Sequence, residues 1–133
     1  MSSYRSEIPR PSTLGFHVSD ITIMGLHAGA NIEFLRTIEP SVGFEVLTFA
    51  GHHEVDYVRE LLPAPDPVVV ETRVIRVGTS SFTLASELRD ETGALVSMSR
   101  SVYVCAAGDR NGSVPIPASL RAGLEAALPE HQS

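Results

Sequence analysis

The stretch that decides the fold is His53-Glu-Val-Asp-Tyr-Val-Arg-Glu-Leu-Leu-Pro-Ala-Pro-Asp-Pro-Val-Val-Val-Glu-Thr-Arg-Val74, because two strand-like runs meet there across a turn. Polar and apolar residues alternate in the first run, which is typical of a half-buried β-strand. The proline-rich segment at residues 63–67 favours a turn and cannot continue a hydrogen-bonded strand. We therefore predict a strand over residues 53–61 and, after the turn, a second strand that begins at Val68.

Three alternating runs follow this turn and predict an antiparallel ladder. They cover residues 68–77, 82–88 and 95–105. Short segments link them, and residues 89–93 carry Asp and Gly in positions that suit a hairpin turn. Residues 78–81 link the preceding pair of strands. The second half of the chain is therefore expected to form consecutive antiparallel strands.

The two ends of the chain are expected to lie outside this ladder. Residues 1–12 are polar and carry two prolines, so we expect a flexible or loosely docked lead-in. Residues 116–128 predict a short closing helix that begins after Pro117, and Ser119 is a residue type that caps helices. At 133 residues the chain is predicted to form a single domain.

Upstream of the first run, the pattern changes to a helical period. Residues 14–23 alternate and predict a strand, and residues 25–31 are interpreted as a turn. From Asn31 onward, apolar residues recur at three- and four-residue steps, which predicts one helix of about 18 residues. Pro40 should kink or split that helix, and Gly51 should end it. A five-stranded antiparallel sheet covered on one face by this helix is an α+β domain.

Composition excludes several classes of function. The net charge is −6 and the ten basic residues are all arginines scattered along the chain, so no basic surface for a nucleic acid is expected. Without lysine, Schiff-base chemistry is excluded. Cys105 is the only cysteine, and adjacent His52 and His53 point to opposite faces of a strand, so neither a disulfide nor a metal site is predicted. No apolar run approaches the roughly 20 residues of a membrane span and the start lacks a signal-peptide core, so a cytoplasmic protein is expected.

Four segments, in this order, resemble hotdog-fold proteins of the 4-hydroxybenzoyl-CoA thioesterase type. They are the turn region at 18–31, the segment Phe34-Leu-Arg-Thr-Ile-Glu39, the Ser-Phe strand with its hairpin at 81–96, and the closing segment at 114–121. The resemblance implies a hotdog fold, in which a five-stranded antiparallel sheet wraps around one long helix. It also implies an enzyme that hydrolyses acyl-CoA or acyl-carrier-protein thioesters without a cofactor. Where the family has its catalytic aspartate, this chain has Thr22 or Met24, according to the alignment, so the catalytic acid would be atypical.

Two other interpretations stay open. A dehydratase-like hydro-lyase could use the same fold, and the missing aspartate also suits a non-catalytic protein that binds an acyl ligand. In each case we expect a homodimer or a homotetramer, because a strand with apolar and aromatic residues at Val55, Tyr57 and Leu61 would otherwise be an unpaired edge. The resemblance implies that the active site lies at the dimer interface.

Thioester hydrolysis needs hydrogen-bond donors for the oxyanion and a base that activates water. The predicted helix start places the backbone amides of Gly29, Ala30 and Asn31 where they could hold a carbonyl oxygen. His27 and Asn31 are candidate polar partners, although a turn histidine and a helix cap would explain them structurally. The candidate bases are Asp20, Glu33 and Glu39, which could equally be solvated surface carboxylates.

The resemblance also implies where the substrate would bind. Tyr57 and Arg59 share a strand face near the expected interface and substrate channel. Ser81 begins the Ser-Phe strand, but Gly-Thr-Ser precedes it where the family often has basic residues for the CoA phosphates. Arg76, together with Arg73, is the expected substitute. Gly29 and Ala30 would let the thioester approach the backbone closely.

Overall fold

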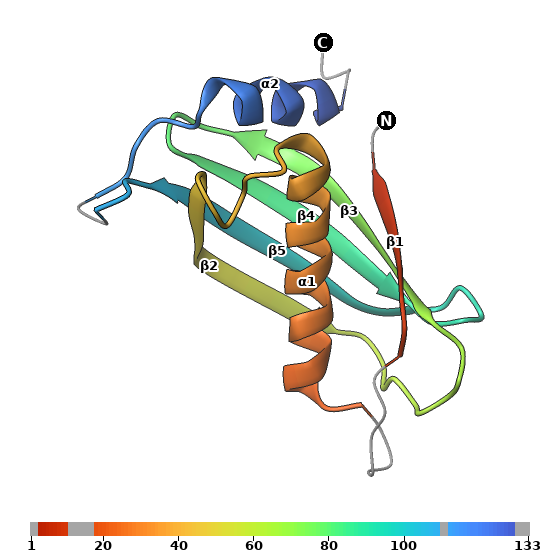
Figure 1. Cartoon of the computed structure of the whole chain (residues 1–133). Coiled ribbons are helices and arrows are strands. Elements are labelled where there is room, and N and C mark those ends of the chain that lie inside the picture. The colour runs from red at the N-terminus through yellow and green to blue at the C-terminus, as the bar shows by residue number, and fades with distance from the viewer. Residues whose placement is uncertain (1–2, 11–17, 110–111, 130–133) are drawn as a thin grey trace.

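The computed structural model describes residues 3–10, 18–109 and 112–129, which form an antiparallel sheet and two helices (Figure 1). The strands stand in the order β1-β3-β4-β5-β2, so β1 and β2 are the two edges of the sheet. In chain order the elements are β1 (Tyr4–Ile8), α1 (Asp20–Ile38), β2 (Leu47–Tyr57), β3 (Val68–Val77), β4 (Ser81–Arg89), β5 (Leu95–Ala106) and α2 (Ala118–Ala127).

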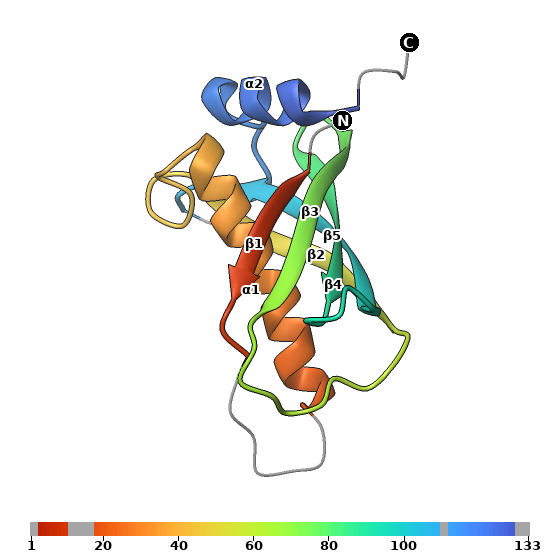
Figure 2. The same ribbon diagram turned by 90° about the vertical axis from the view of Figure 1, so that its right-hand side faces the viewer.

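The sheet curves around α1, which packs against β1, β3 and β4 (Figure 2). This arrangement confirms the predicted α+β hotdog architecture. The strand β3 spans the predicted residues 68–77, and β4 and β5 differ from their predicted ranges only at their ends. Alternation was a reliable signal here because every second residue along most of β3 is buried against the helix side of the sheet.

The long helix α1 begins at Asp20 rather than at Asn31, so the strand and the turn predicted before it are wrong for the described residues. Residues 14–17 of that predicted strand lie outside the described residues. Ser19 caps the helix, because its hydroxyl accepts a hydrogen bond from the Thr22 amide at 3.2 Å. The same apolar residues also fit a helical stripe, whose buried members include Ile23, Leu26, Ala30 and Phe34.

The helix ends at Ile38, so it does not continue through Pro40 as predicted. Proline lacks the amide that a helix interior requires, and the chain turns before β2 starts at Leu47. Gly51, the predicted end of the helix, lies inside β2 at a bulge in the pairing with β5. The strand predicted over residues 53–61 corresponds only in part to β2, because β2 starts earlier and ends at Tyr57.

The described part of the N-terminal lead-in, residues 3–10, contains a strand rather than a loosely docked segment, and residues 1–2 and 11–12 of that prediction lie outside the described residues. Residues Tyr4–Ile8 form β1, which pairs antiparallel with β3. Ser6 is buried, and the Tyr4 hydroxyl donates a hydrogen bond to Glu33 of α1 at 2.7 Å. The sequence did not predict this strand because its residues are mostly polar. Polar residues are tolerated at the exposed positions of an edge strand such as β1.

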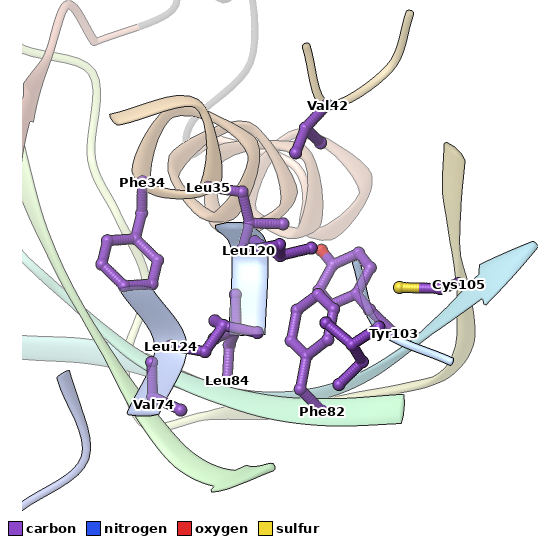
Figure 3. Close-up of a cluster of buried hydrophobic side chains, with 11 residues drawn as sticks. Phe34, Leu35, Val42, Val74, Phe82, Leu84, Tyr103, Cys105, Leu120 and Leu124 are labelled. Atoms are coloured by element: carbon purple, nitrogen blue, oxygen red, sulfur yellow. The ribbon is translucent and has the colours of Figure 1, made fainter. Parts of the chain in front are cut away.

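The buried apolar residues form two separate clusters on the helix side of the sheet. Along β4, Leu84 belongs to the first cluster and Leu88 to the second, and the polar Ser86 stands between them. Figure 3 shows the first cluster, in which Phe82 and Tyr103 stack with ring centroids 5.6 Å apart. The second cluster contains Val18, Ile23, Leu26, Ala30, Leu61, Val68, Val70, Leu88 and Val96.

The closing helix α2 covers one end of the sheet and packs on α1 and β3 (Figure 1). Its Leu120 and Leu124 are fully buried in the first cluster. Ser119 does not cap α2, since no side chain caps this helix; its hydroxyl instead donates a hydrogen bond to Glu39 at the end of α1. The side chain that would cap α2 therefore connects the two helices.

Gly123 of α2 packs directly against Ile38 of α1, and Gly123→Ala should destabilise the protein. A Cβ atom there would lie 2.0 Å from Cγ2 of Ile38. Alanine is the better helix former by about 1 kcal/mol, but overpacking of a tight contact costs typically 1–3 kcal/mol, so we expect a net loss. Urea unfolding of Gly123→Ala, of Ile38→Ala and of the double variant would measure it. The double variant should be more stable than additivity predicts, whereas a stabilised Gly123→Ala protein would contradict this contact.

Candidate functional site

Buried polar side chains form a band between the two apolar clusters, which we call the polar seam. Thr72, Ser86 and Ser99 lie directly opposite one another on β3, β4 and β5. A buried hydroxyl or imidazole is costly unless it is hydrogen-bonded. Hydrogen bonds within the seam satisfy His27 and the four serines, but the Thr72 hydroxyl has no partner among the described residues. Its members are His27, Asn31, Thr72, Ser86, Ser97, Ser99 and Ser101.

His27 crosses the seam from α1 and is fully buried. Its Nδ1 lies 2.7 Å from Oγ of Ser86 and its Nε2 lies 2.7 Å from Oγ of Ser97. Burial lowers the pKa of His27 to about 4, and the nearby His53 lowers it further in the same direction. The imidazole is therefore neutral near pH 7, and both of its nitrogens have partners. The structure places this predicted catalytic residue inside the core, away from any surface pocket that we describe below.

Asn31 continues the seam one helical turn further along α1. Its Nδ2 donates hydrogen bonds to the Tyr103 hydroxyl at 3.1 Å and to Oγ of Ser101 at 3.4 Å. Nδ1 of His53, on the edge strand β2, lies 2.5 Å from the same Ser101 oxygen. Among the described residues, Oδ1 of Asn31 and Nε2 of His53 are buried atoms without a hydrogen-bond partner.

The predicted oxyanion donors are not available, because Gly29, Ala30 and Asn31 lie in the interior of α1. Backbone amides in a helix interior donate to the carbonyl four residues earlier and cannot point at a substrate. The free amides and the positive end of the helix dipole are found at Asp20 instead. The predicted donors differ from the observed ones because α1 starts at Asp20, eleven residues before the predicted start at Asn31.

A pocket of about 290 Å³ lies at this N-terminal end of α1, and we call it the α1 pocket. It brings together Asp20, Tyr57 and Arg59, three of the residues that the sequence singled out. The Tyr57 hydroxyl donates a hydrogen bond to the backbone carbonyl of Asp20 at 3.1 Å. Burial, followed by the charge of Asp20, raises the pKa of Tyr57, so the phenol keeps its proton near pH 7. The remaining lining residues are Val18, Ile23, Val58 and Glu60.

The α1 pocket therefore contains three kinds of chemical group at a helix N-terminus. Asp20 offers an exposed carboxylate, Arg59 an exposed guanidinium and Tyr57 a hydroxyl. A carboxylate can take a proton from water, and a guanidinium can stabilise a developing negative charge. This combination suits attack of water on a polarised carbonyl.

The two other candidate bases, Glu33 and Glu39, lie away from the N-terminal end of α1, and each accepts a hydrogen bond from another element. Glu39 follows the last residue of the helix, roughly 28 Å from Asp20 along the helix axis. It accepts hydrogen bonds from Ser119 and, at 2.6 Å, from the Ser41 hydroxyl, and these contacts lower its pKa, with that of Ser119 first. Glu33 accepts the hydrogen bond from Tyr4 described above. Neither residue lines the α1 pocket.

Arg76 and Ser81, the other predicted substrate-binding residues, lie at the opposite end of the sheet from the α1 pocket. They flank the β3–β4 turn, close to α2 (Figure 1). The backbone carbonyl of Ser81 accepts a hydrogen bond from the Gly78 amide at 2.7 Å, which closes this turn. The structure therefore does not bring Arg76 or Ser81 together with Asp20.

Sequence reasoning did not identify the serines of the seam. The run Ser97-Met-Ser-Arg-Ser101 places a serine at every second position of β5, and all three are buried. This period of two predicts that the three serines share one face of the strand, since alternate residues of a strand point to the same side. Three small hydroxyls on a buried face indicate a polar interior rather than an ordinary apolar core.

In the part of the chain that the structure describes, no helix is long and apolar enough to cross a membrane.

A family model for the thioesterase-like superfamily matches residues 15–124. A comparison with curated proteins finds no match.

Several solved structures share this fold. A predicted thioesterase from Bacillus stearothermophilus is 24% identical with a TM-score of 0.85, and the match covers 96% of this chain and 97% of that one. A Thermus thermophilus thioesterase complexed with coenzyme A and Zn is 23% identical, with a TM-score of 0.79 and coverage of 90% and 95%. A 1,4-dihydroxy-2-naphthoyl-CoA thioesterase from Synechocystis is 15% identical, with a TM-score of 0.76 and coverage of 92% and 94%. At these identities the likeness concerns the fold.

Proposed function

The chain belongs to the thioesterase-like superfamily, and from this premise we propose that it hydrolyses an acyl-CoA or acyl-carrier-protein thioester in the α1 pocket. The observation that carries the proposal is the convergence of Asp20, Tyr57 and Arg59 on one pocket at a helix N-terminus. Asp20 is the first residue of α1, whereas Tyr57 ends β2 and Arg59 follows that strand, so the three residues come from distant parts of the sequence. The coenzyme A bound to the Thermus thermophilus relative supports a CoA thioester as one substrate class.

In the proposed reaction, Asp20 takes a proton from a water molecule that attacks the thioester carbonyl carbon. The carbonyl oxygen becomes an oxyanion, which Arg59 and the positive end of α1 stabilise. The carbon–sulfur bond then breaks, the electron pair leaves with sulfur, and the thiolate takes up the proton that Asp20 accepted from water, which regenerates the carboxylate. Tyr57 donates to the backbone of Asp20 and holds the end of β2 against the start of α1. Asp20 would thereby replace the aspartate that the chain lacks at the family's usual position.

Binding of a non-hydrolysable acyl-CoA analogue that keeps the carbonyl group, with a methylene inserted between the carbonyl carbon and sulfur, tests the location of this site. We expect Arg59→Ala to weaken binding at least tenfold in calorimetry, because a hydrogen bond to a charged group contributes about 1.5–3 kcal/mol. Arg100→Ala is the matched control, since Arg100 is an exposed arginine that lies outside the α1 pocket. Equal affinity of both variants and the wild type would place the ligand elsewhere.

We also propose that the chain forms a homodimer or a dimer of dimers through β2. This strand is an edge of the sheet over all of its 11 residues. Of the three residues on which the sequence-based expectation rested, Tyr57 is exposed and Val55 half-buried on that strand, whereas Leu61 follows it and is buried in the second apolar cluster. An edge strand of this length is a template for pairing with another chain.

A further inference from the structure

The α1 pocket has a polar rim and an apolar floor. Asp20, Tyr57 and Arg59, which carry the proposed chemistry, are all exposed. Val18 and Ile23 line the same pocket but are only 2% and 3% exposed, so they lie beneath the rim. The coenzyme or carrier part of a thioester is large and polar and stays in solvent. With the carbonyl group at the rim, the acyl chain is therefore the part that contacts the floor.

Backbone hydrogen bonds close the floor of the pocket. The Val18 amide, just before α1, donates to the Leu61 carbonyl at 2.7 Å. The amides of Val58 and Arg59, just after β2, both donate to the Val96 carbonyl of β5, at 2.8 Å and 3.2 Å. These bonds hold the segments on the two sides of the pocket to each other and to the sheet. An acyl chain cannot pass between them without breaking backbone hydrogen bonds.

The second apolar cluster fills the space beneath the floor. Val18 and Ile23 belong to this cluster, and none of its buried members is more than 9% exposed. Protein interiors are close-packed and contain few voids larger than a water molecule. The four larger pockets of the described chain share no lining residue with the α1 pocket. Within the described residues, the pocket is therefore a closed depression rather than the mouth of a tunnel.

The volume of the pocket limits the size of the acyl group. Its 290 Å³ lies at the lower end of the range for ligand pockets, which is about 300–1,000 Å³. A methylene group is similar in size to a water molecule, which occupies about 30 Å³ in the liquid, so the pocket holds about ten such groups. The carbon, oxygen and sulfur atoms of the thioester take up about three of them. Room remains for about seven further carbons.

The charges around the pocket disfavour an acyl group that ends in a carboxylate. Such a group would be buried against Val18 and Ile23, and an unpaired buried charge is costly. Among the described lining residues, Arg59 is the only cation, and it lies at the rim. The carboxylates of Asp20 and Glu60 also line the pocket and would repel a second negative charge.

We infer that the substrate is a thioester of a short, uncharged acyl group, with up to about eight carbons in all. Val18 and Ile23 are the residues that determine this specificity, because they form the floor on which the chain ends. The inference rests on the proposed function, since it takes the thioester carbonyl to lie at the rim of the α1 pocket.

A series of straight-chain acyl-CoA thioesters from two to sixteen carbons tests the size limit. Up to about eight carbons, kcat/KM should rise about fourfold for each added methylene, which corresponds to about 0.8 kcal/mol of burial. Beyond that length it should stop rising, because the additional carbons remain in solvent. Succinyl-CoA should react at least tenfold more slowly than butyryl-CoA, which has the same number of carbons. A rise that continues to sixteen carbons, or equal rates for the two four-carbon compounds, would overturn the inference.

Replacing Ile23 by alanine tests the assignment of the floor. The change removes three carbons, so the length at which kcat/KM stops rising should increase by about three carbons. Ile32→Ala is the matched control, since Ile32 lies on the same helix but outside the α1 pocket, and its profile should match the wild type. If Ile23→Ala does not fold, Ile23→Val should shift the limit by about one carbon. An unchanged limit in a folded Ile23 variant would contradict the assignment.

Calorimetry with non-hydrolysable analogues of the same series separates this inference from the proposed function. If no thioester is cleaved but affinity rises to about eight carbons and then levels off, the proposed function fails and the size limit of the pocket holds. If thioesters are cleaved but the longest chains are preferred, the proposed function holds and the inference is wrong. If no analogue binds, the α1 pocket is not an acyl site and the inference is overturned.

Discussion

Replacing Asp20 by asparagine should lower kcat for thioester hydrolysis about a thousandfold, which corresponds to about 4 kcal/mol of transition-state stabilisation. Asparagine keeps the size and polarity of the side chain but cannot accept the proton of the attacking water. Asp20 lies at the start of α1 and lines the α1 pocket. Glu33 and Glu39 lie outside this pocket, where they accept hydrogen bonds from Tyr4 and Ser119. Steady-state kinetics on a thioester that the wild type accepts would measure the loss.

Asp66→Asn is the matched control, because Asp66 is an exposed carboxylate outside the α1 pocket. It should leave kcat unchanged. Asp20→Asn should also cost about 0.3–1 kcal/mol of stability, since Asp20 lies in the first turn of α1 and interacts with the helix dipole. Thermal unfolding separates this small effect from the catalytic one. Activity of Asp20→Asn within a few-fold of the wild type would remove Asp20 from the mechanism.

Acidification from pH 7 to pH 4 should lower the free energy of unfolding by about 3 kcal/mol through His27 alone. The pKa of His27 is about 4 in the folded chain, against an ordinary value of 6.5. Below pH 6.5 the unfolded chain therefore binds a proton that the folded chain does not. The stability is complete above pH 6.5 and is lost as the pH falls towards 4, below which both states are protonated and the loss stops.

Urea unfolding across this pH range would measure the effect, with His27→Gln as the comparison. Glutamine offers a donor and an acceptor to Ser86 and Ser97 but does not titrate, so its stability should fall less steeply between pH 6.5 and pH 4. Other groups titrate in both proteins and cancel in the difference. Parallel curves for the two proteins would mean that His27 is not held neutral by the core.

Strands β3 to β5 were predictable from the sequence, β2 and the long helix only in part, and β1 not at all. Strands β3 to β5 have alternating patterns, and short turns tie them to their neighbours in sequence, so local information is sufficient. The segment before Asn31 has a pattern that fits either a strand or a helix, and two glycines in it made a turn plausible. What decides it is the cap at Ser19 and the burial of every third or fourth residue against a sheet formed much later in the chain.

The residues of the candidate site could be predicted from the sequence, but their proximity in space could not. Asp20, Tyr57 and Arg59 were each chosen from the sequence, but the reason for their proximity is the start of α1 beside the end of β2. Because α1 begins at Asp20 rather than at Asn31, the backbone amides of Gly29 and Ala30 lie inside the helix and are not part of the site. The partners of His27 are serines on two other strands, and no local pattern connects them to it.

The most direct test of the account is the release of free thiol from a panel of acyl-CoA and acyl-carrier-protein thioesters by the wild-type protein. We expect thiol to appear at a rate proportional to enzyme concentration for at least one acyl class, and the Asp20→Asn protein to release it about a thousandfold more slowly from the same compound. If no thioester in the panel is cleaved although calorimetry shows that an acyl-CoA binds, the chain is an acyl-binding protein and the proposed catalysis is contradicted.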